Sequence, residues 1–178
     1  MILISEKLIF IHIPRTGGTS IESALGQKLG NDEKHLAASE IRKKAGDELW
    51  ENAFVFSFVR NPWDRMISLY HQPYFKNQTD YADKGLEHFI RNYNPAAWEK
   101  KFYYEYLDTD GIDFVGRFEN RAADLAKISK ETGVTFDVDI HERKTSRRQD
   151  YRSYYDDHSA QLVYDMYRSD IEEFGYKF

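Results

Sequence analysis

The chain has 178 residues, a length that suits one domain. Thirty acidic and 25 basic residues give a formal net charge of −5, which argues against a generally basic nucleic-acid binder and permits a local anion site. There is no cysteine, so disulfide scaffolds, thiolate zinc sites and cysteine nucleophiles are excluded. Aromatic residues make up 16% of the chain, enough ring area to bury a core and to exclude wholesale disorder.

The first element is a nearly continuous apolar run, Leu8–Ile13, which predicts a strand buried on both faces, as in a parallel sheet. His12, inside this run, is expected to serve packing. The run is too short to span a membrane and no basic segment precedes it, so we expect a cytoplasmic protein without a membrane span.

A glycine-containing turn follows this strand, at Pro14–Ser20, with the sequence PRTGGTS. From Thr19 the apolar spacing is helical. A second strand is predicted at Ala53–Val59, and Asn61 is placed to cap a helix over Pro62–His71. Strand, glycine loop and helix in this order are typical of the start of a βαβ unit.

Further elements continue the alternation of strands with helices. They are a helical segment over Leu86–Leu107, with its bounds left open around Asn94–Pro95, and a strand at Asp113–Arg117. A helix follows at Arg121–Thr132, with Asn120 as its cap and Gly133 closing it, and a final helix is predicted at roughly Ser159–Phe174. This order predicts an α/β fold with a central, mainly parallel sheet flanked by helices. No linker divides the chain, so one domain over residues 1–178 is expected.

The glycine loop has the composition of an anion site. Two glycines let the backbone approach a phosphate, three hydroxyls can donate to it, and one guanidinium adds a fixed charge. These residues are Arg15, Thr16, Gly17, Gly18, Thr19 and Ser20. The simpler interpretation is a strand–helix turn that needs two glycines for steric reasons. The loop is not a Walker A motif, because its cation precedes the glycines, which disfavours an ordinary ATP-dependent kinase.

A second anion site is indicated where the second strand ends. Arg60 can bind a phosphate with its guanidinium, and Ser68 on the following helix can donate a hydroxyl. Alternatively, Arg60 pairs with Asp64, and Ser68 faces water or its own i−4 carbonyl. Taken with the first loop, this segment favours a nucleotide that has phosphates at both ends of its ribose.

Both segments resemble those of a known family, the carbohydrate-type sulfotransferases. PRTGGTS resembles their 5′-phosphosulfate loop, usually PKTGGTS, and the VRNPWDRMISLY segment ending at Tyr70 resembles their 3′-phosphate segment. The resemblance extends to Val115–Asn120 and to the aromatic C-terminus at Phe174–Tyr176. Arg15 replaces the usual lysine, which keeps the charge and changes its geometry.

The resemblance implies a three-layer fold like that of P-loop NTPases. It also implies transfer of a sulfuryl group from 3′-phosphoadenosine 5′-phosphosulfate (PAPS) to a hydroxyl of a carbohydrate or small molecule, without a metal. Arg15 would contact the 5′-phosphate and the bridging oxygen, Thr16–Ser20 would cradle the 5′ side, and Arg60 with Ser68 would hold the 3′-phosphate. The product would be adenosine 3′,5′-bisphosphate. The chain is short for the family.

A base for the acceptor hydroxyl is expected from the segment between the two phosphate motifs, as in similar sulfotransferases. His35 is the first candidate, and Glu33 and Glu40 are the alternatives. The same resemblance suggests that the basic run Arg143–Arg148 folds over the nucleotide. Its contacts would come from Lys144, Ser146 and Arg147.

Two other functions remain open from the sequence. One is a P-loop-type kinase or nucleotide hydrolase, which would bind Mg-ATP without preferring a 3′-phosphate. The other is a non-catalytic module that binds a nucleotide or a glycan. RNA binding is disfavoured because no nucleic-acid motif accompanies the basic run, and no histidine–carboxylate cluster has metal-ligand spacing. The direct start without a membrane anchor suggests a bacterial protein.

Overall fold

The computed structural model describes residues 2–4, 7–28, 30, 34–72, 84–94, 100–137 and 149–178. The chain divides into two compact units. The sheet unit comprises Met1–Val59 and Tyr103–Arg143, and the helical unit comprises Arg60–Phe102 and Lys144–Phe178. Within the described ranges, no helix is both long and apolar enough to cross a bilayer.

The sheet unit is built on four strands in the order β1-β2-β3-β4. Their bounds are Ile2–Ile4 for β1, Leu8–Ile11 for β2, Phe54–Val59 for β3 and Phe114–Arg117 for β4. β1 is antiparallel to β2, whereas β2, β3 and β4 are parallel neighbours. The prediction of a mainly parallel sheet is therefore confirmed.

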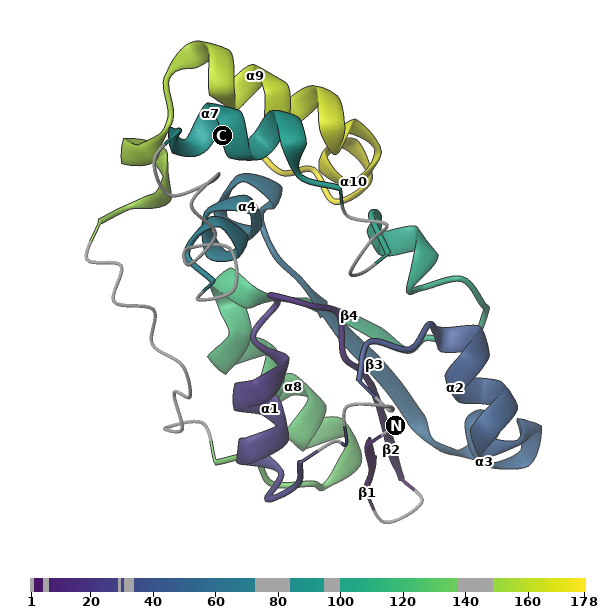
Figure 1. The fold of residues 1–178 in the computed structure, drawn as a ribbon. Helices are drawn as coiled ribbons and strands as arrows, with labels where there is room; N and C mark the ends of the chain where they lie inside the picture. The colour runs from purple at the N-terminus through teal and green to yellow at the C-terminus, as the bar shows by residue number, and fades with distance from the viewer. Residues whose placement is uncertain are drawn as a thin grey trace. The chain divides into compact units, whose positions relative to one another are not determined.

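Helices cover both faces of this sheet (Figure 1). On one side lie α1 (Gly18–Ala24) and α8 (Arg121–Thr132), and on the other lie α2 (Ala38–Ala45) and α3 (Asp47–Asn52). Alternate strand side chains point to the α1/α8 side, where they form a hydrophobic cluster. The buried members of this cluster are Leu8, Phe10, Ile21, Ala24, Phe56, Phe58, Leu125, Ile128 and Phe136. An α/β arrangement with a helix-flanked sheet is thus established for this unit.

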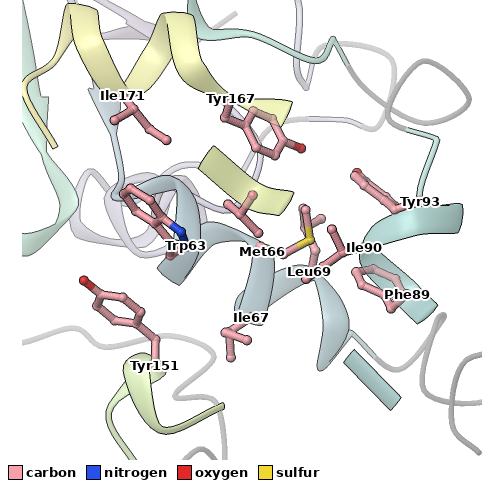
Figure 2. Packing of buried hydrophobic residues seen from close by; sticks show 11 residues of the cluster. Trp63, Met66, Ile67, Leu69, Phe89, Ile90, Tyr93, Tyr151, Tyr167 and Ile171 are labelled. Atoms are coloured by element: carbon pink, nitrogen blue, oxygen red, sulfur yellow. The ribbon is translucent and has the colours of Figure 1, made fainter. Parts of the chain in front are cut away.

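The helical unit has a separate hydrophobic core. Its elements are α4 (Pro62–Tyr70), α7 (Gly85–Asn92), the 3₁₀ helix η5 (Tyr151–Tyr154), α9 (Asp157–Met166) and α10 (Arg168–Glu173). Figure 2 shows side chains from α4, α7 and the C-terminal helices converging on one cluster. Trp63, Met66, Ile67 and Leu69 of α4 are all buried in it. α4 is consequently the central helix of this unit.

Several predicted elements differ from the structure. The strand predicted at Leu8–Ile13 ends at Ile11. One helix over Leu86–Leu107 is wrong, because α7 ends at Asn92 and is followed by extended backbone at Tyr93, two residues before a proline. Residues 95–99 lie outside the described part, and the next helical turn is the 3₁₀ helix η3 (Tyr103–Glu105).

The C-terminal helix is also divided. It was predicted as one helix over Ser159–Phe174, but Tyr167, with φ −121° and ψ 27°, separates α9 from α10. At the start of α8, Asn120 has the expected position without the expected bond, since its side chain donates to Asp124 at 3.0 Å. Gly133 ends α8 in the left-handed conformation, as predicted. The strand β1 and the helices α2 and α3 were not predicted.

Candidate functional site

The glycine loop connects β2 with α1 in the sheet unit, and its backbone is held by local bonds. The Thr16 side chain is buried, and its hydroxyl donates to the Ile13 carbonyl over 2.8 Å. The amide of Ser20 donates to the Gly17 carbonyl over 3.0 Å, which starts the helix. The single hydroxyl hydrogen of Thr16 is thus used inside the loop. Thr19 is half-buried and Ser20 is buried in the first turn of α1.

Both glycines have a steric role. Gly17 adopts φ 87°, and a Cβ there would stand 2.9 Å from the Phe118 ring. A Cβ on Gly18 would stand 2.1 Å from Cδ2 of His12, so the imidazole occupies the space that a side chain would need. The interpretation of the glycines as steric requirements of the turn is therefore supported, and it is compatible with a close backbone approach to a ligand.

Arg15 and His35 share an unusual backbone conformation. They have φ of 67° and 64°, and among the described residues they are the only non-glycine residues with positive φ. Few residues other than glycine adopt this region, and among them asparagine, aspartate and histidine are enriched. Strained conformations of this kind persist when surrounding contacts fix them, and they cluster at active sites. The two residues proposed for catalysis from the sequence are thus the two with this conformation.

The imidazole of His35 is hydrogen-bonded to the backbone between β2 and the glycine loop. Its Nδ1 donates to the His12 carbonyl over 3.1 Å, and the two imidazole rings meet edge to face with centroids 4.7 Å apart. Burial, followed by the electrostatic effect of the neighbouring His12, lowers the pKa of His35 to about 4. The ring is therefore neutral near pH 7, with a lone pair on one nitrogen.

Sequence reasoning missed Glu22, which lies on α1 and is 1% exposed. Its Oε1 is 2.6 Å from Nδ1 of His12, and its Oε2 is 3.2 Å from Nζ of Lys34. The His12–Glu22 contact is a close electrostatic approach and not an aligned hydrogen bond. The sequence contained one indication of a buried carboxylate, because Glu22 directly follows the core residue Ile21 and so lies next to the apolar face of the helix. His12 is buried, as expected, and it has a charged neighbour that was not expected.

The second predicted phosphate segment belongs to the helical unit. Arg60 follows the last residue of β3, and its Nε and Nη2 both lie 2.8 Å from Oδ2 of Asp64, four residues later. The alternative pairing of Arg60 with Asp64 is therefore present, and it is buried. Ser68 is buried on α4, one turn beyond Asp64.

The remaining candidates are placed as follows. The Glu40 carboxylate accepts from the Ala37 amide at the start of α2 over 2.7 Å, which gives it a capping role. Glu33, Lys144, Ser146 and Arg147 lie outside the described residues.

Comparison with known proteins identifies the family. The model of the sulfotransferase family, Sulfotransfer_2, matches residues 2–109, more than half of the chain, so the chain belongs to this family. The match includes both predicted phosphate segments and ends before the basic run and the segment Val115–Asn120.

An uncharacterized protein of Archaeoglobus fulgidus is 30% identical over 112 residues, which are 59% of this chain and 88% of that protein. No solved structure matches the chain significantly.

Proposed function

We propose that the protein transfers a sulfuryl group from PAPS to a hydroxyl of a carbohydrate or small molecule. The family supports sulfotransfer in general. The proposal of transfer from PAPS to a hydroxyl, with Arg15 and His35 as the catalytic residues, rests on the positive φ angles of these two residues. Such a transfer requires a cation for the leaving group and a proton acceptor for the acceptor hydroxyl. Arg15 on the glycine loop is the cation, and the neutral imidazole of His35, bonded to the His12 carbonyl before that loop, is the proton acceptor.

The proposed reaction is an in-line displacement at sulfur. The acceptor oxygen forms a bond to sulfur while the bond between sulfur and the bridging phosphate oxygen breaks. The acceptor proton moves to Nε2 of His35, and the negative charge that develops on the bridging oxygen is stabilised by Arg15. The leaving group is adenosine 3′,5′-bisphosphate. No metal is needed in this scheme, because a fixed guanidinium balances the leaving charge.

In this proposal Arg60 and Ser68 select the 3′-phosphate. The ion pair with Asp64 holds the Arg60 guanidinium in one orientation, which lowers the conformational entropy lost when an anion binds. Lys144, Ser146 and Arg147 would add contacts to the nucleotide from the basic run.

A calorimetric titration with adenosine 3′,5′-bisphosphate tests this function, with 5′-AMP and Mg-ATP as comparisons. We expect metal-independent binding of the bisphosphate, about tenfold or more tighter than 5′-AMP, because a guanidinium–phosphate contact contributes about 1.5–3 kcal/mol. A preference for Mg-ATP would instead identify a kinase or hydrolase. Binding of the bisphosphate without transfer from PAPS to any of a panel of acceptors would identify a non-catalytic module.

Arg60 is best tested by a charge-neutral double variant. Arg60→Gln/Asp64→Asn removes both buried charges together, so neither remains uncompensated. We expect it to weaken bisphosphate binding about 10- to 100-fold and to leave 5′-AMP binding unchanged. Glu87→Gln/Arg91→Gln is the matched control, since it removes an exposed pair with the same i,i+4 spacing from α7 of the same unit. Equal bisphosphate affinity in wild type and both variants would remove Arg60 from the site.

A further inference from the structure

Three ionisable side chains of the sheet unit form a cluster that the proposed transfer does not use. They are Glu22 on α1, His12 after β2, and Lys34 in the segment before α2. Glu22 and His12 are 1% and 5% exposed, and Lys34 is about one-fifth exposed. A carboxylate this deeply buried is costly unless cations or hydrogen-bond donors surround it. Its two neighbours here contact different oxygens of the same carboxylate.

His35 is attached to the protein through both of these neighbours. It follows Lys34 directly in the chain, and its Nδ1 donates to the carbonyl of His12 over 3.1 Å. Glu22 therefore contacts the side chain of each residue that fixes His35, one through Oε1 and the other through Oε2. The positive φ of His35 is a conformation that needs such outside contacts to persist.

The bond to His12 also decides which ring nitrogen of His35 carries the proton. A carbonyl oxygen can only accept, so Nδ1 of His35 must hold the hydrogen. In the neutral ring, Nε2 is then the nitrogen with the lone pair. A general base needs a lone pair on a defined atom. The hydrogen bond at Nδ1 fixes the tautomer and so keeps the lone pair on Nε2.

We infer that Glu22 is a positioning residue: by holding His12 and Lys34 it keeps His35 in the Nδ1–H form with Nε2 available as a base. The part of this inference that concerns the base rests on the proposed function. In this scheme Glu22 does not react itself, and it acts through His12 and Lys34.

Nitrogen-15 spectra of the histidine rings test the inference without any substrate. In the wild type we expect His35 as the Nδ1–H tautomer at pH 7, with a pKa near 4. In Glu22→Gln, the single amide oxygen can accept from His12 or from Lys34 and not from both, so one of the two contacts that hold His35 is lost. We expect mixed tautomers and a pKa that rises by more than one unit toward 6.5.

The direction in which the pKa of His35 changes in Glu22→Gln separates a positioning role of Glu22 from a simple charge effect. The negative charge of Glu22 raises the pKa of His35, so removing that charge alone would lower it. A His35 ring in Glu22→Gln that keeps the Nδ1–H tautomer, with an unchanged or lower pKa, would overturn the inference. Glu131→Gln, an exposed position on α8, is the control and is expected to leave the ring spectrum unchanged.

Lys34→Met is the second variant, for use if Glu22→Gln does not fold by circular dichroism. Lys34 is the most exposed member of the cluster, so its loss disturbs the core least. Its charge also lowers the pKa of His35, so the tautomer is the deciding readout in this variant. Mixed tautomers support the inference, and a retained Nδ1–H form contradicts it.

Turnover gives an independent measurement. We expect Glu22→Gln to lower kcat with PAPS about tenfold and to leave bisphosphate affinity unchanged. Absence of transfer in the wild type would overturn the proposed function and leave the ring result standing. An unaltered ring beside normal transfer would overturn only the role of Glu22.

Discussion

At the scale of single residues, His35 is surrounded by groups that disfavour its charged form. Burial is the largest cause of its low pKa, followed by the electrostatic effect of His12, and Lys34 adds a smaller effect in the same direction. The native ring therefore stays neutral at pH values at which an unfolded chain would bind a proton. This asymmetry has a consequence for stability that does not depend on any substrate.

The free energy of unfolding should decrease as the pH is lowered from about 6.5 to about 4, because of the His35 ring. The unfolded chain takes up a proton near pH 6.5 and the native state only near 4, so acid favours unfolding. At pH 5 the loss is about 2 kcal/mol relative to pH 7, since one pKa unit corresponds to about 1.4 kcal/mol. Urea unfolding of the wild type and His35→Gln at both pH values measures it.

The variant should lose about 2 kcal/mol less than the wild type on acidification. His158→Gln, which replaces an exposed histidine of α9, is the control and should follow the wild type. An identical pH dependence in wild type and His35→Gln would show that the ring binds its proton at the same pH in the native and unfolded states, which contradicts the lowered pKa.

At the scale of the element, α4 depends on the residue before it. The Oδ1 of Asn61 accepts from the Trp63 amide over 3.0 Å, and its Nδ2 donates to Tyr151 and to the Lys177 carbonyl. One buried amide thus caps the central helix and joins it to η5 and to the C-terminal residues of the same unit.

Asn61→Ala should cost about 2–3 kcal/mol of unfolding free energy. A lost N-cap contributes about 1 kcal/mol, and the loss of the two hydrogen bonds that Nδ2 donates adds the rest. Asp150→Ala, which removes an exposed cap of η5, should cost less than half as much. Urea denaturation at pH 7 measures both, and equal losses would mean that the internal bonds of Asn61 contribute nothing.

Elements with strong local signals could be predicted from the sequence. Two apolar, β-branched runs gave β2 and β3, and the Asn–Pro pair marked the start of α4. By contrast, α2 presents only small or isolated apolar residues, with Ala38 and Ile41 buried, and its pattern was too weak.

The residues of the candidate site could be proposed from their types and motifs, whereas their pairings in the structure could not. Sequence named Arg15 and His35, but their backbone conformations depend on contacts made elsewhere in the fold. It left two interpretations for Arg60, and only the packed helix showed the pairing with Asp64. Glu22 lies 10 and 12 residues from its partners, a spacing that no local rule connects.

At the scale of the whole molecule, the chain forms two compact units and passes from the first to the second twice. Each unit is discontinuous in sequence and has its own hydrophobic cluster. The cluster of the sheet unit combines strands with α1 and α8, whereas that of the helical unit is organised on α4. A cluster of its own gives each unit a source of stability that a local substitution can weaken.

Hydrogen exchange should therefore respond to core substitutions unit by unit. Phe56→Ala, at a fully buried position of β3, should increase exchange most in the sheet unit, and Ile67→Ala should do so in the helical unit. Each truncation costs about 2–5 kcal/mol. Mass spectrometry of peptides from both units measures the response, and an equal increase across both units in both variants would show that they unfold together.

The contact between His12 and Gly18 couples two positions that the sequence presents as separate features. Because the imidazole fills the volume of the missing side chain, the penalty for alanine at position 18 depends on the residue at position 12. Whether a substitution is tolerated at position 12 or 18 therefore depends on the residue at the other position. A chain that exchanged His12 for a smaller residue would release position 18 from glycine, while giving up the neighbour that Glu22 contacts.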